Sequence, residues 1–313
     1  VFIRIKGFQY LRCFIKMISY SVYAHILNRK SKESQKKQPL FVLYLCFMAE
    51  ANNFDGKVVW LTGASSGIGK ELSIQLSQQN AKLILSSRNK KRLEELKVNL
   101  VNTDEHMVLP LDLADSASFS ERYYEVIAKY GVVDILIQNG GISQRGTAAE
   151  SSEEVVRQIM EVNFFGNVLL SKTVLPALRK SKGQIVVISS IAGKFGFFLR
   201  SSYSASKHAL HGYYESLALE EESSGLSVTV VCPGKINTPI STNALSADGN
   251  KHGDMDHNQE TGMDVSVCVE ELLTAVVKKK REVLIGNKET KAVTLKRFLP
   301  ALFWRVIRKQ SPT

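Results

Sequence analysis

Cysteine is scarce in this chain, and its distribution excludes two kinds of site. The four cysteines, Cys13, Cys46, Cys232 and Cys268, are too far apart for a zinc motif and too few for a disulfide-rich scaffold. We therefore predict no metal site. We expect a reducing environment, which means a cytoplasmic location or the surface of an intracellular membrane.

Long hydrophobic runs are also missing. The longest apolar run, at residues 40–48, has nine residues, whereas a helix that crosses a bilayer needs about 20. The sequence therefore predicts no transmembrane helix.

Acidic residues are fewer than basic ones, and the imbalance lies at the two ends. The chain has 30 Asp and Glu against 41 Lys and Arg, a formal net charge of +11. Residues 1–47 carry +8 and residues 278–313 carry +9, which leaves −6 for the middle. An acidic body between basic ends does not suit a nucleic-acid surface, so we expect no nucleic-acid partner.

The 313 residues suit one large α/β domain with an extension at each end. We predict the domain over residues 48–287 and a basic C-terminal extension over residues 288–313. Met48 has the position of a natural start, so residues 1–47 are interpreted as a translation artefact or cleaved leader. The alternative is a targeting or anchoring segment.

A strand, a glycine-rich turn and a helix are predicted in succession between residues 57 and 78. Residues 57–61 are apolar, as in a buried strand, and residues 70–78 carry Leu72 and Leu76 at helical spacing. The turn between them reads Thr62-Gly63-Ala64-Ser65-Ser66-Gly67-Ile68-Gly69. Glycines at such a turn let backbone N–H groups approach a phosphate at the helix N-terminus. The order predicts a nucleotide site, with an ordinary tight loop as the alternative.

A second motif pairs Tyr203 with Lys207, and Ser190 lies thirteen residues upstream of the tyrosine. A spacing of four places the two side chains on one face of a helix. A nearby cation lowers the pKa of a tyrosine, which makes Tyr203 a candidate proton donor and acceptor. Taken alone, the pair could also be an exposed helix contact.

Together the two motifs resemble the short-chain dehydrogenase/reductase family, which carries Thr-Gly-x-x-x-Gly-x-Gly and Tyr-x-x-x-Lys. The resemblance covers residues 54–287, and residues 143–146 and 295–298 are similar to the dehydrogenase/reductase member 7 group. It implies a doubly wound parallel α/β sheet of the Rossmann type in a single domain. It also implies a nicotinamide cofactor, interconversion of a carbonyl and an alcohol, and a homo-oligomer.

The second predicted strand, at residues 83–86, bears on the choice of cofactor. An acidic residue at its end binds the ribose of NAD, whereas an arginine nearby accommodates the additional phosphate of NADP. Ser87 and Arg88 stand at this point, which favours NADP(H). The alternative is that Arg88 belongs to a solvated helix start with Lys90, Lys91 and Arg92.

Further cofactor contacts are implied by the resemblance at the ends of later strands. The family has Asn-Asn-Ala-Gly where this chain has Gln138-Asn139-Gly140-Gly141, and we expect the turn to persist because Asn139 and Gly141 are kept. The full predicted cofactor set is Thr62, Gly63, Ser65, Ser66, Gly67, Ile68, Gly69, Arg88, Asp112, Leu113, Asn139, Gly141, Tyr203, Lys207, Pro233, Gly234 and Thr238.

Four catalytic residues are likewise implied by the resemblance: Ser190, Asn163, Tyr203 and Lys207. Ser190 would hydrogen-bond the substrate carbonyl oxygen, and Tyr203 would give that oxygen a proton as hydride arrives. Lys207 would lower the tyrosine pKa and bind the nicotinamide ribose. In the family the backbone carbonyl at the position of Asn163 holds a water that leads to the lysine.

The substrate is less clearly encoded. Residues 195–199 hold three phenylalanines, which favours an apolar rim and a hydrophobic carbonyl or alcohol, although the rings could instead pack in the core or at a subunit interface. Residues 240–263 are long and polar and are predicted to form a substrate lid. The His252 and His257 side chains there, beside acidic residues, are not predicted to bind metal.

The C-terminal segment has an apolar stripe at helical spacing with basic residues mostly off it. The stripe consists of Leu295, Phe298, Leu299, Leu302, Phe303, Val306 and Ile307, with a kink expected at Pro300. A basic amphipathic helix suits an anionic membrane surface or packing against protein. The prediction is an NADP(H)-dependent oxidoreductase; the alternative is a catalytically weak NADP(H)-binding scaffold or redox-sensing module at a membrane surface.

Overall fold

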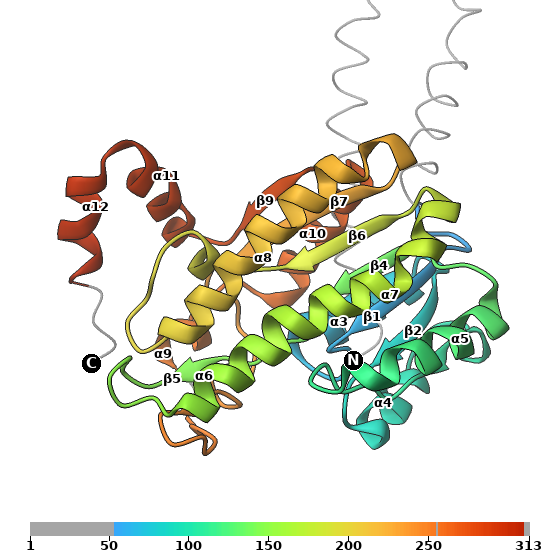
Figure 1. Cartoon of the computed structure of the whole chain (residues 1–313), viewed down its shortest axis with the longest axis horizontal. Helices are drawn as coiled ribbons and strands as arrows, with labels where there is room; N and C mark the ends of the chain where they lie inside the picture. The colour runs from blue at the N-terminus through green and yellow to red at the C-terminus, as the bar shows by residue number, and fades with distance from the viewer. Residues whose placement is uncertain (1–52, 255, 310–313) are drawn as a thin grey trace, which may run out of the picture. The chain divides into compact units, whose positions relative to one another are not determined.

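The computed structural model describes residues 53–254 and 256–309. The predicted basic leader at residues 1–47 lies outside the described residues. Parallel strands form the central sheet: β1 (Val58–Thr62), β2 (Lys82–Ser86), β3 (Met107–Val108), β4 (Ile135–Gln138), β6 (Gln184–Ile188), β7 (Ser227–Pro233) and β9 (Glu282–Ile285). Their order is β3-β2-β1-β4-β6-β7-β9, so the chain winds outward from β1 in one direction and from β4 in the other (Figure 1). The predicted doubly wound parallel α/β fold is confirmed.

Helices cover both faces of this sheet. One face carries α3 (Gly67–Ser77), α4 (Lys90–Lys97) and α10 (Val265–Val277), and the other carries α5 (Phe119–Tyr130), α7 (Gly166–Ser181) and α8 (Ser201–Glu220). Figure 1 shows α5, α7 and α8 running across the same face. Along β1, Val59 and Leu61 join the core under α3 while Val58 and Trp60 join the core under α7. Because both faces are covered, every residue of β1 is buried.

Shorter elements connect the strands and the larger helices. They are β5 (Gln144–Arg145), which pairs with β8 (Leu245–Ser246), the helices α6 (Glu153–Met160) and α9 (His257–Glu260), a π-helical turn (Glu161–Phe165), and 3-10 turns at Thr103–Glu105, Ser116–Ser118, Ile191–Gly193, Glu222–Ser224 and Lys288–Thr290. The chain continues into α11 (Lys291–Phe298) and α12 (Pro300–Ile307). Among the described residues, no helix is both long and apolar enough to cross a bilayer.

Proline interrupts two of these elements. β3 ends at Val108 because the nearby Pro110 has no N–H to donate, although the Leu111 N–H still reaches the Ser87 carbonyl at 3.1 Å. The C-terminal stripe is not one helix, because the chain breaks at Leu299, with φ −133° and ψ 62°, before Pro300 starts α12.

Strand register brings three of these ends to one level. Thr62 lies opposite Ser86, and Leu61 lies opposite Ile137, so the residues that follow β1, β2 and β4 emerge together at one edge of the sheet. Gly69 packs here against the turn after β1. A Cβ on Gly69 would lie 2.1 Å from the Gly63 carbonyl oxygen and 2.6 Å from the Asn139 Nδ2.

We expect Gly69→Ala to lower the free energy of unfolding by about 1–3 kcal/mol, because α3 would have to move off the turn. Urea unfolding at equilibrium measures the change. Gly212→Ala on α8 is the matched control, since a Cβ there has no neighbour within 4 Å and alanine is the better helix former by about 0.5–1 kcal/mol. Equal stabilities for the two variants would contradict the close packing at Gly69.

Candidate active site

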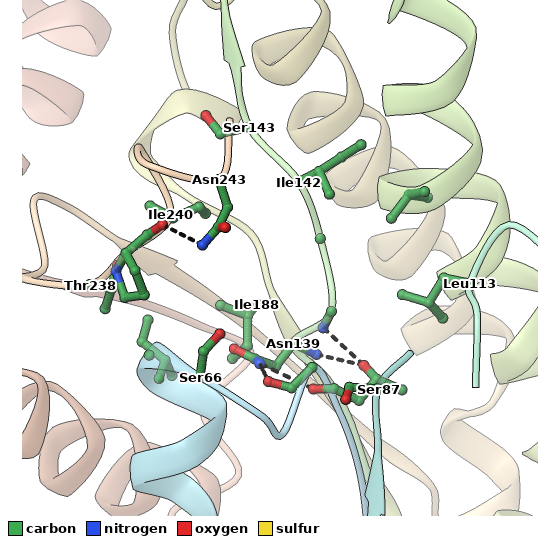
Figure 2. Close-up of a pocket in the computed structure, with 18 of the residues that line it drawn as sticks. Ser66, Ser87, Leu113, Asn139, Ile142, Ser143, Ile188, Thr238, Ile240 and Asn243 are labelled. Carbon is green, nitrogen blue, oxygen red and sulfur yellow. Dashed lines mark hydrogen bonds between the residues drawn. The ribbon is translucent and has the colours of Figure 1, made fainter. Parts of the chain in front are cut away.

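A cleft of about 990 Å³ opens at the carboxyl ends of the strands, where the strand order reverses between β1 and β4. Open α/β sheets bind ligands at this position. Figure 2 shows Ser143, Ile240 and Asn243 at one end of the cleft and Ser87 and Leu113 at the other. The cleft is therefore long enough to bring several distant segments of the chain around one ligand.

The turn after β1 is held by side chains from both sides of the switch point. Thr62 Oγ1 accepts hydrogen bonds from the backbone N–H groups of Asn139 and Gly140, at 3.1 and 2.9 Å. Asn139 Nδ2 donates to the carbonyl oxygens of Thr62 and Gly63, both at 3.1 Å. Gly63 has φ +65°, which favours glycine. The N-terminus of α3 consequently faces the cleft in a fixed position, which suits a phosphate group.

The end of the cleft beyond β2 is basic. Arg88, Lys90 and Arg92 line it, and the buried Ser87 Oγ has no hydrogen-bond partner among the described residues. The acidic side chain that lines this end, Asp112, accepts a hydrogen bond from the backbone N–H of Ala114 at 3.0 Å. Cationic donors next to an unpaired hydroxyl fit the ribose and phosphate groups of a nucleotide.

The two departures from the family pattern at residues 138–141 leave the turn intact. Gln138 is buried, and its Nε2 donates to the Asn167 carbonyl at 2.9 Å and to Ser171 Oγ at 3.2 Å, so this side chain supports α7. At Gly140 a Cβ would lie 2.6 Å from Leu113 Cδ1. The glycine there therefore accommodates Leu113 beneath the cleft.

Ser190, Tyr203 and Lys207 converge on the cleft from β6 and α8. The Ser190 hydroxyl accepts from the Ala192 N–H at 3.1 Å and donates to the Pro233 carbonyl at 3.4 Å, and it lies near enough to the Tyr203 hydroxyl to lower the tyrosine pKa. Lys207 is buried, with Nζ donating to the Ile188 carbonyl at 2.7 Å and lying 5.8 Å from the centre of the Tyr203 ring. A polar substrate oxygen beside Ser190 would therefore meet the tyrosine hydroxyl.

The pKa values of this group are set mainly by burial. Burial raises the pKa of Tyr203, against the smaller lowering effects of Arg200, the Ser190 hydrogen bond and Arg145. Burial also lowers the pKa of Lys207 to about 8. The expectation that Lys207 lowers the tyrosine pKa is thus not met: desolvation dominates, and the cations that act on Tyr203 are the two arginines.

Asn163 lies beside the cleft without lining it. It occupies the π-helical turn between α6 and α7, where Oδ1 accepts from the Ile142 N–H at 2.8 Å and Nδ2 donates to Ser206 Oγ at 3.0 Å. Its backbone carbonyl accepts from Asn167 Nδ2 at 2.9 Å. Here the side chain joins α8, next to Lys207, to the segment after β4. Of the predicted cofactor set, all residues line the cleft except Gly69, which packs behind the turn.

Sequence reasoning missed an ion cluster beside Tyr203. Arg145, which is buried, and Arg200 both bond the carboxylate of Asp256; the Arg145 Nε lies 3.1 Å from Oδ1 and the Arg200 Nη2 lies 2.7 Å from Oδ2. The three residues are far apart in the chain and follow no helix or strand periodicity, so no sequence pattern indicated that they would meet. The cluster ties the segment at residues 240–263, which contains β8 and α9, to the start of α8.

The expected aromatic rim is not found at the cleft. No residue of the segment 195–199 lines the cleft. Phe195 is buried instead, with its ring centre 4.7 Å from that of Phe197 and 5.1 Å from that of Phe303 on α12. The alternative interpretation, that these rings pack in the core or at a subunit interface, holds for Phe195 and Phe197, which pack in the core, whereas Phe198 is 48% exposed.

Among the described residues, His211, Cys232 and Glu282 form a group with metal-ligand atoms close together. Lys194 Nζ occupies the space beside them, bonding Glu282 and lying 3.2 Å from His211 Nδ1. Burial, followed by the charge of Lys194, lowers the pKa of His211 to about 4. The positive charge of the Lys194 ammonium group would repel a metal cation at this position.

Comparison with known proteins places these features in a wider group. The profile described as short chain dehydrogenase matches residues 57–249. Dehydrogenase/reductase SDR family member 7B of Mus musculus is 40% identical over 261 residues, which is 81% of each chain. Member 7 of Homo sapiens is 38% identical, covering 80% of this chain and 77% of its own. A short-chain dehydrogenase from Streptomyces avermitilis has a TM-score of 0.70 at 26% identity, over 82% of this chain and 100% of that one. The resemblance to the member 7 group is confirmed.

We expect Asp256→Asn to loosen the segment at residues 240–263, because two guanidinium groups would lose their shared carboxylate. A loss of about 1–3 kcal/mol in local stability corresponds to trypsin cleavage after Lys251 that is about five-fold faster or more. Asp254→Asn, an exposed carboxylate in the same segment, is the matched control. Equal cleavage rates for the two variants would show that the cluster does not hold this segment.

Proposed function

Because this chain belongs to the short-chain dehydrogenase family and is therefore an oxidoreductase of alcohols and carbonyls, we propose that NADP(H) is its hydride carrier. We further propose that Tyr203 is the proton donor and acceptor. The observation that carries the proposal is the meeting of Ser190, Tyr203 and Lys207 in one cleft with the turn after β1.

The preference for NADP(H) is supported by the end of the cleft beyond β2. The phosphate that distinguishes NADP from NAD needs cationic donors, and Arg88 stands there beside the unpaired Ser87 hydroxyl. Asp112 lies after β3 and caps its own turn, so no carboxylate follows β2 in the place where one would bind a ribose hydroxyl.

Side chains of the protein would supply the proton that the substrate oxygen takes up. The bound nicotinamide would supply or accept the hydride. Ser190 would orient the substrate oxygen by hydrogen bonding to it and to Tyr203. Because burial keeps the pKa of Tyr203 above its ordinary value, the phenol is neutral near pH 7 and is in the form that donates a proton during reduction. Such positioned proton transfer contributes about 10²- to 10⁴-fold.

Lys207 would act beside Tyr203 rather than on the substrate. With its pKa lowered to about 8, it is still mostly protonated at pH 7. Its Nζ lies 2.7 Å from the Ile188 carbonyl at the end of β6, which fixes the ammonium near the space for the nicotinamide ribose. We assign it to ribose binding and to proton transfer with Tyr203.

The substrate is proposed to have an apolar body. Ile142, Val162, Ile240 and Leu245 line the cleft, although Arg200 and Lys251 line it as well. Apolar walls with a few polar groups are typical of sites that bind small organic molecules. The apolar surface comes from these aliphatic residues rather than from the phenylalanines at residues 195–199.

We expect Tyr203→Phe to lower kcat for NADPH-dependent carbonyl reduction by about 10²- to 10⁴-fold, because the proton donor is lost. The assay follows NADPH oxidation against aromatic, aliphatic, steroid and retinoid carbonyls, and fluorescence titration checks that NADPH still binds. Tyr213→Phe, on the same helix but outside the cleft lining, is the control. Unchanged kcat in Tyr203→Phe would exclude the assigned role.

We expect Arg88→Ala to raise the KM for NADPH by about ten-fold or more while changing the KM for NADH little, because a charged hydrogen bond to phosphate contributes about 1.5–3 kcal/mol. Lys91→Ala, at an exposed position on α4 just after Arg88 that does not line the cleft, should leave both values unchanged. An equal rise for the two cofactors would speak against phosphate recognition by Arg88.

A further inference from the structure

Helices α11 and α12 expose a group of large apolar side chains to solvent. Its members and their exposed fractions are Phe298 (70%), Leu299 (56%), Leu302 (45%), Trp304 (52%) and Val306 (42%); we call them the C-terminal patch. Thirteen large apolar side chains are exposed in the described part of the chain, and these five fall within nine consecutive residues. Single exposed apolar residues are ordinary, but such a concentration marks an interaction surface.

The patch is presented by helices that are anchored on their other side. Phe303 is 1% exposed and packs against Phe195, and Leu295 and Ile307 pack against the same cluster. Lys296 Nζ also donates to the Lys194 carbonyl at 2.8 Å. In Figure 1 α11 and α12 stand out at one side of the domain. The apolar stripe expected from the sequence is thus divided: part anchors the helices, and the rest faces solvent.

The charge around the patch is of one sign. Residues 291–309 contain six Lys or Arg and no Asp or Glu. Arg297, Arg305, Arg308 and Lys309 are exposed, and Arg305 lies between Trp304 and Val306 in the chain. Because there is no carboxylate among residues 291–309, a protein partner would have to supply all of the opposing charge for these cations. They suit a layer of anionic headgroups.

Side-chain chemistry points the same way. Tryptophan favours the boundary between water and hydrocarbon, because its ring is apolar and its N–H is polar. Helices that lie in this boundary carry Lys and Arg beside Trp, Phe and Leu. Each of α11 and α12 has eight residues, which fits a location in the plane of the surface.

We propose that the C-terminal patch docks this domain onto an anionic lipid bilayer. The side chains of Phe298, Leu302 and Trp304 enter the headgroup boundary, and the surrounding arginines pair with acidic headgroups. Because α12 packs on Phe195, the segment that leads from Ser190 to Tyr203 then lies on the membrane side of the domain. The inference does not depend on which cofactor or substrate the cleft takes.

Tryptophan fluorescence of the full chain tests this directly. The sequence has two tryptophans, and Trp60 is fully buried with its Nε1 bonded to Ser86, so Trp304 is the one that water reaches. On vesicles of phosphatidylcholine with phosphatidylserine, we expect a blue shift and a fall of about half or more in acrylamide quenching, because lipid replaces water around the indole. Vesicles of phosphatidylcholine alone should give a much smaller change.

Two double variants separate charge from apolar contact. Arg305→Glu with Arg308→Glu should weaken binding to the anionic vesicles by about ten-fold or more, since each cation near such a surface contributes about 1 kcal/mol. Leu302→Ser with Val306→Ser should weaken binding as well, while the salt dependence of the remaining binding stays as in the unaltered chain, because the cations are kept. Leu219→Ser, 64% exposed on α8, is the matched control and should bind as the unaltered chain does. Near-UV circular dichroism confirms that each variant is folded.

Three results would overturn the proposal. In the first, the chain fails to bind anionic vesicles. In the second, it binds them but the quenching of Trp304 is unchanged, which would assign the contact to another segment such as residues 1–52. In the third, the unaltered chain forms a dimer in solution that Leu302→Ser with Val306→Ser dissociates, and Trp304 does not respond to vesicles. The patch would then be a subunit interface.

Discussion

The hydrogen bonds between Thr62 and Asn139 are the interaction on which the cleft depends. They cross from the end of β1 to the end of β4, the one place where the two halves of the sheet diverge. Four bonds from Asn139 and Gly140 to Thr62 and Gly63 fix the turn after β1 against the turn after β4. The N-terminus of α3, the Ser190 loop and the start of α8 then face a common space.

Burial is the second constraint, and it acts differently on each polar group. It keeps Tyr203 protonated, brings the pKa of Lys207 down to about 8 and brings that of His211 down to about 4. Arg145 and Arg200 oppose the effect on Tyr203 and are balanced in turn by Asp256. The segment that carries Asp256 therefore influences the pKa of Tyr203 as well as the shape of the cleft.

The C-terminal helices show how one amphipathic pattern can serve two purposes. Phe303 and Ile307 pack their apolar side chains against the domain, while Phe298, Leu302 and Trp304 are exposed to solvent. The break at Leu299 makes this division feasible, because it turns α12 relative to α11. An uninterrupted helix would present a single stripe, which could face either the domain or an external surface.

Local patterns were enough to predict the first two strands, the glycine turn and the order of Ser190, Tyr203 and Lys207, because short apolar runs, glycine spacing and helical spacing are local properties. Gly69 and Gln138 could be placed in their motifs, but their packing roles depend on what lies above and below the turn. The Arg145, Arg200 and Asp256 cluster, the position of Phe195 under α12 and the direction of the Tyr203 pKa were decided by the tertiary structure. Each of these three features depends on burial and on contacts between residues far apart in the chain. None of them can be predicted from a single segment of the sequence.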